Sequence, residues 1–536
     1  MTARFTLALA ALAMAGAARA QDAATPVPHL ETRGGRHALI VDGAPFLMLG
    51  AQVNNSSNYP AALPRIWPVL DRIGANTVEA PVAWQQIEPE EGRFDFSWVQ
   101  ALLDGARAHD RRVVILWFGA YKNTGAGYTP DWVKLDRRRF PMMRTRDGKD
   151  HDVLSPHGQE TLAADKRAFV ALMGYLRDRD RQNTVILVQV ENETGSYRNP
   201  RDFGAAAQRL FDAPVPAALG KRGNWVTAYG PQADRAFNTW YTARYVGEVA
   251  AAGKAVKPLP MYVNASLSDP FKVPEPTGVA SVGPQQDVIG IWKAAAPAVD
   301  YEAPDIYDRK SADVFAYLDA YRRADNALAV PEIGNATEYA RYFWAAIGRG
   351  AIGFSPFGMD ATDYFNYPLG AKSFDDATLD AFAAKYRLFA PMARDWARIA
   401  FEHPVWGTAK GDDGAPQSTV LGDLAVNASY GEWQFGHRTD SWLKSEPPAW
   451  AGEPVGGAVV AQVAPDQYLV TGDHVRVDLK PRPGAPAGTT VLRVEEGRLQ
   501  NGAFVVERVW NGDQVDYGLN IIDKPVLLRV TTGRMR

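Results

Sequence analysis

The sequence has no cysteine among its 536 residues. This absence excludes disulfide bonds, zinc fingers, iron–sulfur clusters and a cysteine nucleophile. An excess of one charge is also missing, because 58 Lys and Arg nearly balance 61 Asp and Glu. Without a basic surface, we expect no nucleic-acid partner. Apolar runs are short, and none reaches the roughly 18 residues that a membrane-spanning helix needs.

The motifs of most metal and cofactor sites are missing as well. The eight histidines are scattered and form no His-x-x-x-His pair, so we expect no metal site. There is no Walker phosphate loop and no Gly-x-Ser-x-Gly nucleophile turn. We therefore expect no cofactor, and carboxylates remain as the candidates for chemistry.

The N-terminus has the organisation of a secretory signal peptide. Arg4 supplies a positive charge, residues 5–15 are mostly apolar, and Ala18-Arg19-Ala20 puts small residues where a signal peptidase cleaves. We expect residues 1–20 to be removed, which leaves a periplasmic or secreted bacterial protein without a membrane segment. The alternative is a retained N-terminal anchor.

Short β-type runs alternate with longer helical patterns over residues 36–395. Eight such βα units favour a (β/α)8 TIM barrel over an open sheet. The long segments after the third, fourth and fifth runs are expected to form loops around the mouth of the barrel. The eight runs span residues 45–52, 76–80, 112–118, 184–190, 259–264, 301–306, 327–332 and 351–355.

The pattern changes beyond residue 400. Gly, Pro and Asp become frequent, and β-type runs predominate over residues 400–536. Asn501-Gly502 and Asn511-Gly512 are dipeptides that favour two-residue hairpin turns. The fold expected for the whole chain is therefore an α/β barrel followed by a small antiparallel β domain.

Two of the expected barrel strands end in glutamates. The fourth run continues into Glu191-Asn192-Glu193, and the seventh ends at Glu332. Charged groups are costly inside a barrel, so these should emerge at its C-terminal mouth, where barrel enzymes place catalytic groups. Strands four and seven lie on facing sides, so Glu193 and Glu332 should point at each other. Glycoside cleavage needs two opposed carboxylates of this kind.

Residues 188–197 read Val-Gln-Val-Glu-Asn-Glu-Thr-Gly-Ser-Tyr and resemble the acid/base motif of glycoside hydrolase family 35, the retaining β-galactosidases of clan A. Trp84 and the stretch Glu-Pro-Glu-Glu-Gly-Arg-Phe-Asp-Phe at 88–96 resemble a pattern of the clan A β-galactosidases. The resemblance covers residues 36–395. It implies that Glu193 is the acid/base, Glu332 the nucleophile and Asn192 the ligand of the sugar 2-hydroxyl.

The chain also departs from that family. Pro81 stands where animal and plant members have Tyr, and residues 119–123 lack the Glu found there in those members. The nucleophile context is Pro-Glu-Ile-Gly at 331–334 in place of one like Ser-Glu-Phe. The two catalytic assignments survive these changes, but the contacts that select galactose do not carry over.

Other polar and aromatic residues at expected strand ends are candidates for binding substrate. The chain is rich in aromatics, with 15 Trp, 21 Tyr and 22 Phe, and flat rings can stack on sugars. For the tryptophans the alternative is core packing, and for Glu79 it is a structural role. The candidates are Glu79, Trp84, Trp117, Asn264 and Tyr307.

Together these features predict an exported, retaining exo-β-galactosidase that acts on a carbohydrate substrate without a cofactor. The negative charge of Glu332 should raise the pKa of Glu193. The alternatives are a retaining enzyme for another sugar, such as a β-glucoside, β-mannoside or arabinoside, and a non-catalytic glycan-binding barrel. The sequence leaves the oligomeric state and the natural polysaccharide open.

Overall fold

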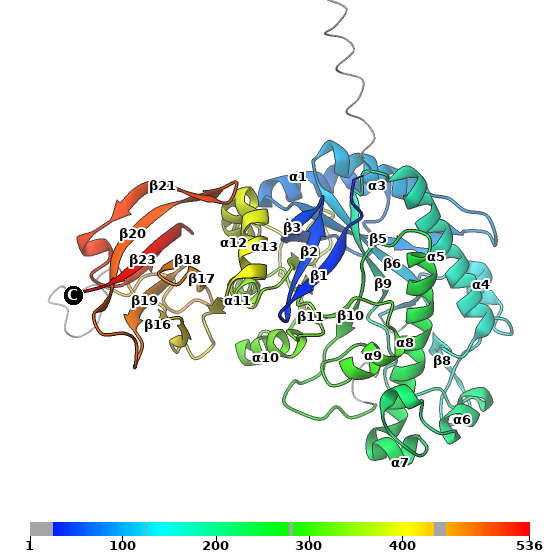
Figure 1. Cartoon of the computed structure of the whole chain (residues 1–536). Helices are drawn as coiled ribbons and strands as arrows, with labels where there is room; N and C mark the ends of the chain where they lie inside the picture. The colour runs from blue at the N-terminus through cyan, green and yellow to red at the C-terminus, as the bar shows by residue number, and fades with distance from the viewer. Residues whose placement is uncertain (1–24, 124, 278–281, 434–445, 536) are drawn as a thin grey trace, which may run out of the picture.

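The computed structural model describes residues 25–123, 125–277, 282–433 and 446–535. Its larger part is a closed barrel of eight parallel strands, with the β domain beside it (Figure 1). The order around the barrel follows the chain and closes between the last strand and the first. The strands are β4 (Met48–Gln52), β5 (Thr77–Ala83), β6 (Arg112–Lys122), β9 (Val185–Asn192), β10 (Met261–Ser266), β11 (Tyr301–Ile306), β12 (Val330–Ile333) and β13 (Gly353–Pro356).

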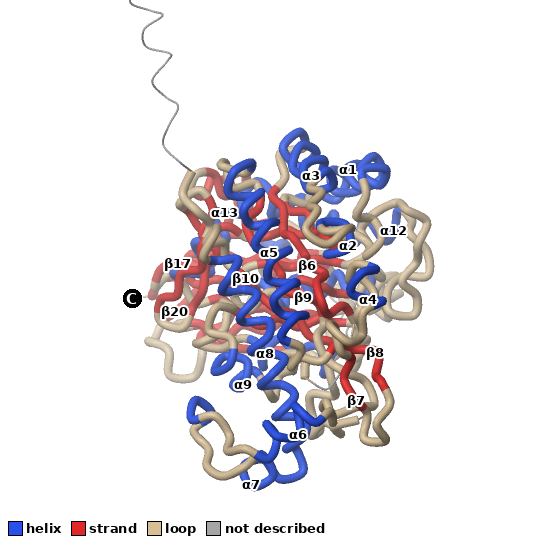
Figure 2. The backbone as a smooth tube through the Cα atoms, turned by 90° about the vertical axis from the view of Figure 1, so that its right-hand side faces the viewer, coloured by secondary structure: helices blue, strands red, loops and turns tan. Residues whose placement is uncertain are grey.

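Helices surround this barrel, and Figure 2 shows the two longest, α5 and α8, side by side across its strands. Their apolar faces pack on the outward-facing side chains of the strands, which gives one continuous core. One such helix follows each of the eight strands. These helices are α1 (Leu63–Ile73), α3 (Ser97–Ala108), α5 (Gln159–Arg179), α8 (Ala233–Lys254), α9 (Ile289–Ala295), α10 (Ser311–Tyr321), α11 (Tyr342–Ile347) and α12 (Asp376–Phe389).

The predicted TIM barrel is confirmed, with each of the eight predicted runs contributing a strand. The first run, residues 45–52, is divided between two sheets. Its start lies in β3 (Ala44–Phe46), which pairs with β2 (Arg36–Val41), and β2 pairs with β1 (His29–Arg33). Side chains of this small sheet join the buried cluster inside the barrel, so the sheet closes the end opposite the mouth.

The long segments after β5, β6 and β9 carry short elements of their own. Residues from the loops after β6, β9 and β10 line the mouth of the barrel, as predicted from the length of these segments, and the loops after β4 and β13 line it as well. The short elements are α2 (Trp84–Ile87), α4 (Asp131–Leu135), β7 (Met142–Arg144), β8 (Asp150–Leu154), α6 (Ala205–Asp212) and α7 (Trp225–Tyr229).

Beyond α13 (Ala393–Glu402), the chain forms two antiparallel sheets that enclose a second apolar cluster. The predicted Asn501-Gly502 hairpin is confirmed, because both residues have positive φ and connect paired strands. The prediction at Asn511-Gly512 is wrong, since a 3-10 turn begins at Gly512. One sheet contains β14 (Val405–Ala409), β17 (Gly457–Ala464), β18 (Gln467–Asp473), β23 (Leu527–Arg534), β20 (Thr489–Gln500) and β21 (Ala503–Trp510), and the other β15 (Gln417–Leu421), β16 (Leu424–Ser429), β19 (Val475–Pro481) and β22 (Leu519–Ile521).

The β domain packs on the barrel through α11 and through the helical segment from α12 to α13 (Figure 1). Asp473 of β18 accepts hydrogen bonds from Trp344 Nε1 (2.8 Å) and Lys385 Nζ (2.6 Å), and all three residues are buried. At the C-terminal end of α11, Gly348 meets the backbone of Gly407 in β14. Apolar side chains of the β domain also join the core of the barrel, so burial, an ion pair and a close backbone contact all connect the two parts.

The predicted signal peptide lies outside the described residues. Among the described helices, none combines the length and the apolar character that a membrane crossing requires.

Substitution Gly348→Ala should destabilise the protein, because a Cβ there would lie 2.1 Å from Gly407 Cα, a backbone atom of the facing strand. Overpacking of this kind costs roughly 1–3 kcal/mol, so we expect a lower midpoint in urea unfolding. Gly290→Ala is the matched control, since its Cβ would meet no atom within 4 Å. Equal midpoints for the two variants would contradict the close contact.

Candidate active site

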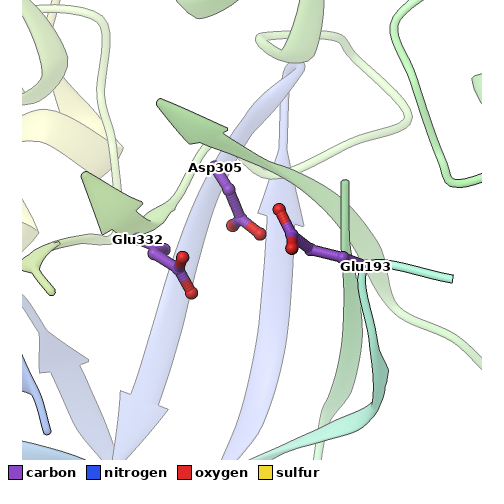
Figure 3. Close-up of side chains that lie close together, drawn as sticks. All are labelled: Glu193, Asp305 and Glu332. Carbon is purple, nitrogen blue, oxygen red and sulfur yellow. The ribbon is translucent and has the colours of Figure 1, made fainter. Parts of the chain in front are cut away.

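Three carboxylates converge at the mouth of the barrel (Figure 3). Glu193 follows β9, Asp305 lies in β11 and Glu332 lies in β12. One carboxylate oxygen from each residue lies within 4.8 Å of the other two. The expected approach of Glu193 and Glu332 across the barrel is therefore present in the structure, with Asp305 as a third member of the group.

Local backbone geometry aims Glu193 at this group. Its φ of 41° lies in the left-handed region, which non-glycine residues adopt at a cost that the surroundings must offset. Its backbone N–H donates to Asn264 Oδ1 (3.0 Å), and Asn264 Nδ2 donates to Asp305 Oδ2 (2.6 Å). Asn264, predicted to contact the ligand, is 1% exposed and instead holds these two acids in place.

Glu332 is held by two donors. Gln52 Nε2 donates to its Oε2 (2.8 Å), and the Tyr307 hydroxyl donates to its Oε1 (2.5 Å). Hydrogen bonds to both oxygens fix the orientation of the Glu332 carboxyl group. Tyr307 also lines the cavity, so its predicted place at the site agrees with the structure.

The surroundings separate the protonation states of the acids. Burial raises the pKa of Glu193 to about 7, and the charge of Glu332 adds to the rise. The Lys122 charge and a hydrogen bond with Asp305 act in the opposite direction on the Glu193 pKa. Burial, and then the charges of Glu332 and Glu193, hold the pKa of Asp305 well above its usual range. Desolvation is thus the larger cause of the Glu193 shift, ahead of the charge named from the sequence.

Lys122 is a member of the site that sequence reasoning missed, as was Asp305. It ends β6, is 7% exposed, and donates from Nζ to the Oδ1 atoms of Asn192 (2.8 Å) and Asn123 (2.5 Å). The third strand was expected to end at residue 118, four residues too early to reveal a charged group after an apolar strand. A charged residue directly after an apolar strand is the pattern that identified Glu193. With the strand end placed correctly, the same pattern would have identified Lys122.

These groups line a cavity of about 1030 Å³. Its wall combines polar groups from the ends of the strands with aromatic rings from the surrounding loops. The lining includes Asn54, Asn55, Lys122, Tyr128, Glu193, Tyr197, Asp305, Tyr307, Asp308, Glu332, Phe357 and Tyr364.

The two predicted stacking tryptophans do not reach this cavity. Trp84 and Trp117 are fully buried, and their indole N–H groups donate to Glu88 (3.0 Å) and Asp165 (3.0 Å). Because both rings fill space between the barrel and the surrounding segments, neither has a face for a sugar. The core-packing alternative is the correct one for both.

Glu79 and Asn192 are buried and are not among the lining residues, but Asn192 adjoins the lining because it precedes Glu193 and accepts a hydrogen bond from Lys122. Glu79 accepts hydrogen bonds from the Ser355 hydroxyl and from the Tyr262 hydroxyl, and burial raises its pKa to about 8. Its carboxyl group bonds protein hydroxyls and lies outside the cavity lining, which favours the structural alternative for Glu79. Asn192 keeps one unused amide donor, Nδ2, which has no hydrogen-bond partner within the described structure.

The converging carboxylates are also the described group whose geometry could admit a metal ion. Donors from Gln52, Tyr307 and Asn264 already bond oxygens of Glu332 and Asp305, and the Lys122 ammonium lies nearby. The carboxyl oxygens that a metal ion would bind are therefore already accepting hydrogen bonds from protein donors. The expectation that no metal is required stays a prediction.

Comparison with known proteins finds two matching family models. Residues 62–256 match a model described as Beta-galactosidase, of glycoside hydrolase family 42, and residues 382–522 match a domain of unknown function, DUF5597. A β-galactosidase of Xanthomonas manihotis is 32% identical over 217 residues, which cover 39% of this chain. The chain matches about a third of that relative, 33% of its length.

Solved structures of β-galactosidases also align with the chain at 12% identity and a TM-score of 0.49. They come from Marinomonas ef1, covering 66% of this chain and 61% of that one, and from Bacillus circulans sp. alkalophilus, covering 66% and 57%. The finer resemblance to family 35 stays a prediction. Over residues 62–256 the sequence is similar to β-galactosidases.

Proposed function

We propose that this protein is a glycoside hydrolase, an exported retaining exo-β-galactosidase. The observation that carries the proposal is the approach of Glu193 and Glu332, each with an oxygen within 4.8 Å of the other. The similarity of residues 62–256 to β-galactosidases supports the same activity. Removal of a signal peptide at residues 1–20 would account for export.

In the first step, a Glu332 oxygen attacks the anomeric carbon while Glu193 donates its proton to the glycosidic oxygen. The bond to the aglycone breaks, the aglycone leaves as an alcohol, and the sugar stays as an ester on Glu332. In the second step, Glu193 removes a proton from water, and the water oxygen displaces Glu332 from the same carbon. Each displacement inverts the configuration at the anomeric carbon, so the product retains the configuration of the substrate.

The separation of the acids supports retention over inversion. Retaining enzymes place the carboxyl groups about 5–5.5 Å apart, whereas inverting enzymes need roughly 6.5–9.5 Å to admit a water. The hydrogen bonds from Gln52 and Tyr307 hold the Glu332 carboxyl group in position, and the raised pKa of Glu193 favours its protonated form. These two environments support Glu193 as the acid/base and Glu332 as the nucleophile.

The loops around the cavity support exo action. Long loops after β6, β9 and β10 surround the cavity, and a pocket accepts a chain end where a cleft would accept a chain interior. The galactose assignment depends on the similarity to β-galactosidases, because the residues expected to contact the 4-hydroxyl differ from those of family 35.

Matched nitrophenyl glycosides test the proposal directly. The purified protein should hydrolyse the β-galactoside faster than the β-glucoside or the α-arabinoside, with retention in the product by NMR. Preference for another sugar would overturn the galactosidase assignment and leave the two-glutamate mechanism. Failure to hydrolyse all three would favour the glycan-binding alternative.

Variants of the two glutamates should differ according to the leaving group. Glu332→Gln should lose nearly all activity on every substrate, because no ester can form. Glu193→Gln should lose roughly 10²–10⁴-fold on substrates with poor leaving groups, and much less on dinitrophenyl glycosides, which need little protonation. Azide should partly restore its turnover. Steady-state kinetics on a leaving-group series would make the measurement, and equal losses in both variants would contradict the assigned roles.

The pH dependence of kcat/KM should follow the pKa of Glu193. The proton donor is active only while protonated, and its pKa is raised to about 7, so activity should fall as the pH increases through about 7. On a dinitrophenyl substrate, where the reaction without the acid is measurable, Glu193→Gln should lack this alkaline limb. A limb that persists unchanged in the variant would show that another group causes it.

A further inference from the structure

Lys122 is a buried cation at the edge of the proposed sugar site. It is the last residue of β6 and pairs in register with Asn192, the last residue of β9. Its side chain is among those lining the cavity, and the residue is 7% exposed. Burying an ammonium group is costly unless it is hydrogen-bonded and balanced by charge.

The surroundings of Lys122 supply both kinds of compensation. Nζ donates to Asn192 Oδ1 (2.8 Å) and to Asn123 Oδ1 (2.5 Å), and it lies 4.8 Å from the centre of the Phe118 ring. Burial lowers the pKa of Lys122, and its interactions with Glu193, Glu332 and Asp305 act in the opposite direction on that pKa. The ammonium is thus fixed between the acids and the Asn192 amide.

This contact determines the orientation of the Asn192 amide. An ammonium group only donates, so the atom of Asn192 that faces Lys122 must be the oxygen. The Nδ2 group is then turned away from Lys122. It is buried and has no hydrogen-bond partner in the part of the chain that the structure describes. A buried donor left unpaired is costly, so a partner is expected when substrate is bound.

We propose that Lys122 is a positioning residue, which orients Asn192 so that Nδ2 donates to the sugar hydroxyl next to the anomeric carbon. The inference rests on the proposed glycosidase function and goes beyond it, because it makes the effect of Lys122 conditional on the 2-hydroxyl. A lysine that only stabilised the fold would affect every substrate alike.

The test compares a nitrophenyl β-galactoside with its 2-deoxy analogue. In Lys122→Met, kcat/KM for the parent should fall by roughly 10- to 100-fold, the range expected for a hydrogen bond to a developing charge. The loss on the 2-deoxy substrate should be much smaller, so the ratio of the two kcat/KM values falls by a similar factor. An unchanged ratio would overturn the proposal.

Lys257→Met is the matched control. Lys257 is also buried (5% exposed), but its ammonium donates to the backbone carbonyls of Leu176 and Asp180, outside the cavity lining. Losing this buried charge should lower both kcat/KM values by the same factor. Wild-type protein that hydrolyses both substrates, with Glu332→Gln hydrolysing neither, shows that the proposed function holds before the ratio is interpreted.

A double-mutant cycle keeps the proposal testable if Lys122→Met does not fold. Lys122→Gln, Asn192→Ala and the double variant should be non-additive on the parent substrate, because both residues act through one hydrogen bond. Once Asn192 is removed, the change at Lys122 should alter the substrate ratio little. Additive losses, with equal effects on the 2-deoxy substrate, would overturn the proposal.

Discussion

The arrangement of the site depends on the burial of four ionisable groups in one small volume. Glu193, Asp305 and Glu332 each have an oxygen within 4.8 Å of the others, and Lys122 is the cation nearby. Three acids this close together cannot all ionise readily, because each negative charge raises the pKa of the other two. Burial raises the pKa of Glu193 and Asp305, while Glu332 receives two hydrogen bonds. These different environments suit Glu193 to the proposed role of proton donor and Glu332 to that of nucleophile.

The closed parallel barrel brings these acids together and gives each one different neighbours. All eight strands point their C-terminal ends at one mouth, so residues far apart in sequence meet there. Amides then set fine positions: Asn264 joins Glu193 to Asp305, and Gln52 joins β4 to Glu332. The rigid strands hold these partners, while the loops supply the aromatic wall of the cavity.

The β domain contributes differently. Its contact with the barrel runs through α11 and the helical segment from α12 to α13, where Asp473 binds Trp344 and Lys385. The described residues that line the cavity all belong to the barrel and its loops, between Asn54 and Leu369. Within the described structure, the β domain therefore supports the helices after β12 and β13 without lining the cavity.

The sequence by itself determined the barrel, the antiparallel tail and the two opposed glutamates, because strand periodicity and charges at strand ends are local patterns. It did not determine which neighbours those ends would meet. Trp84 and Trp117 lie at strand ends yet face the core, and Glu79 and Asn264 bond protein groups instead of the cavity. The environments of Lys122 and Asp305 came only from the tertiary structure, because burial and hydrogen-bond partners arise from strands that are distant in the chain.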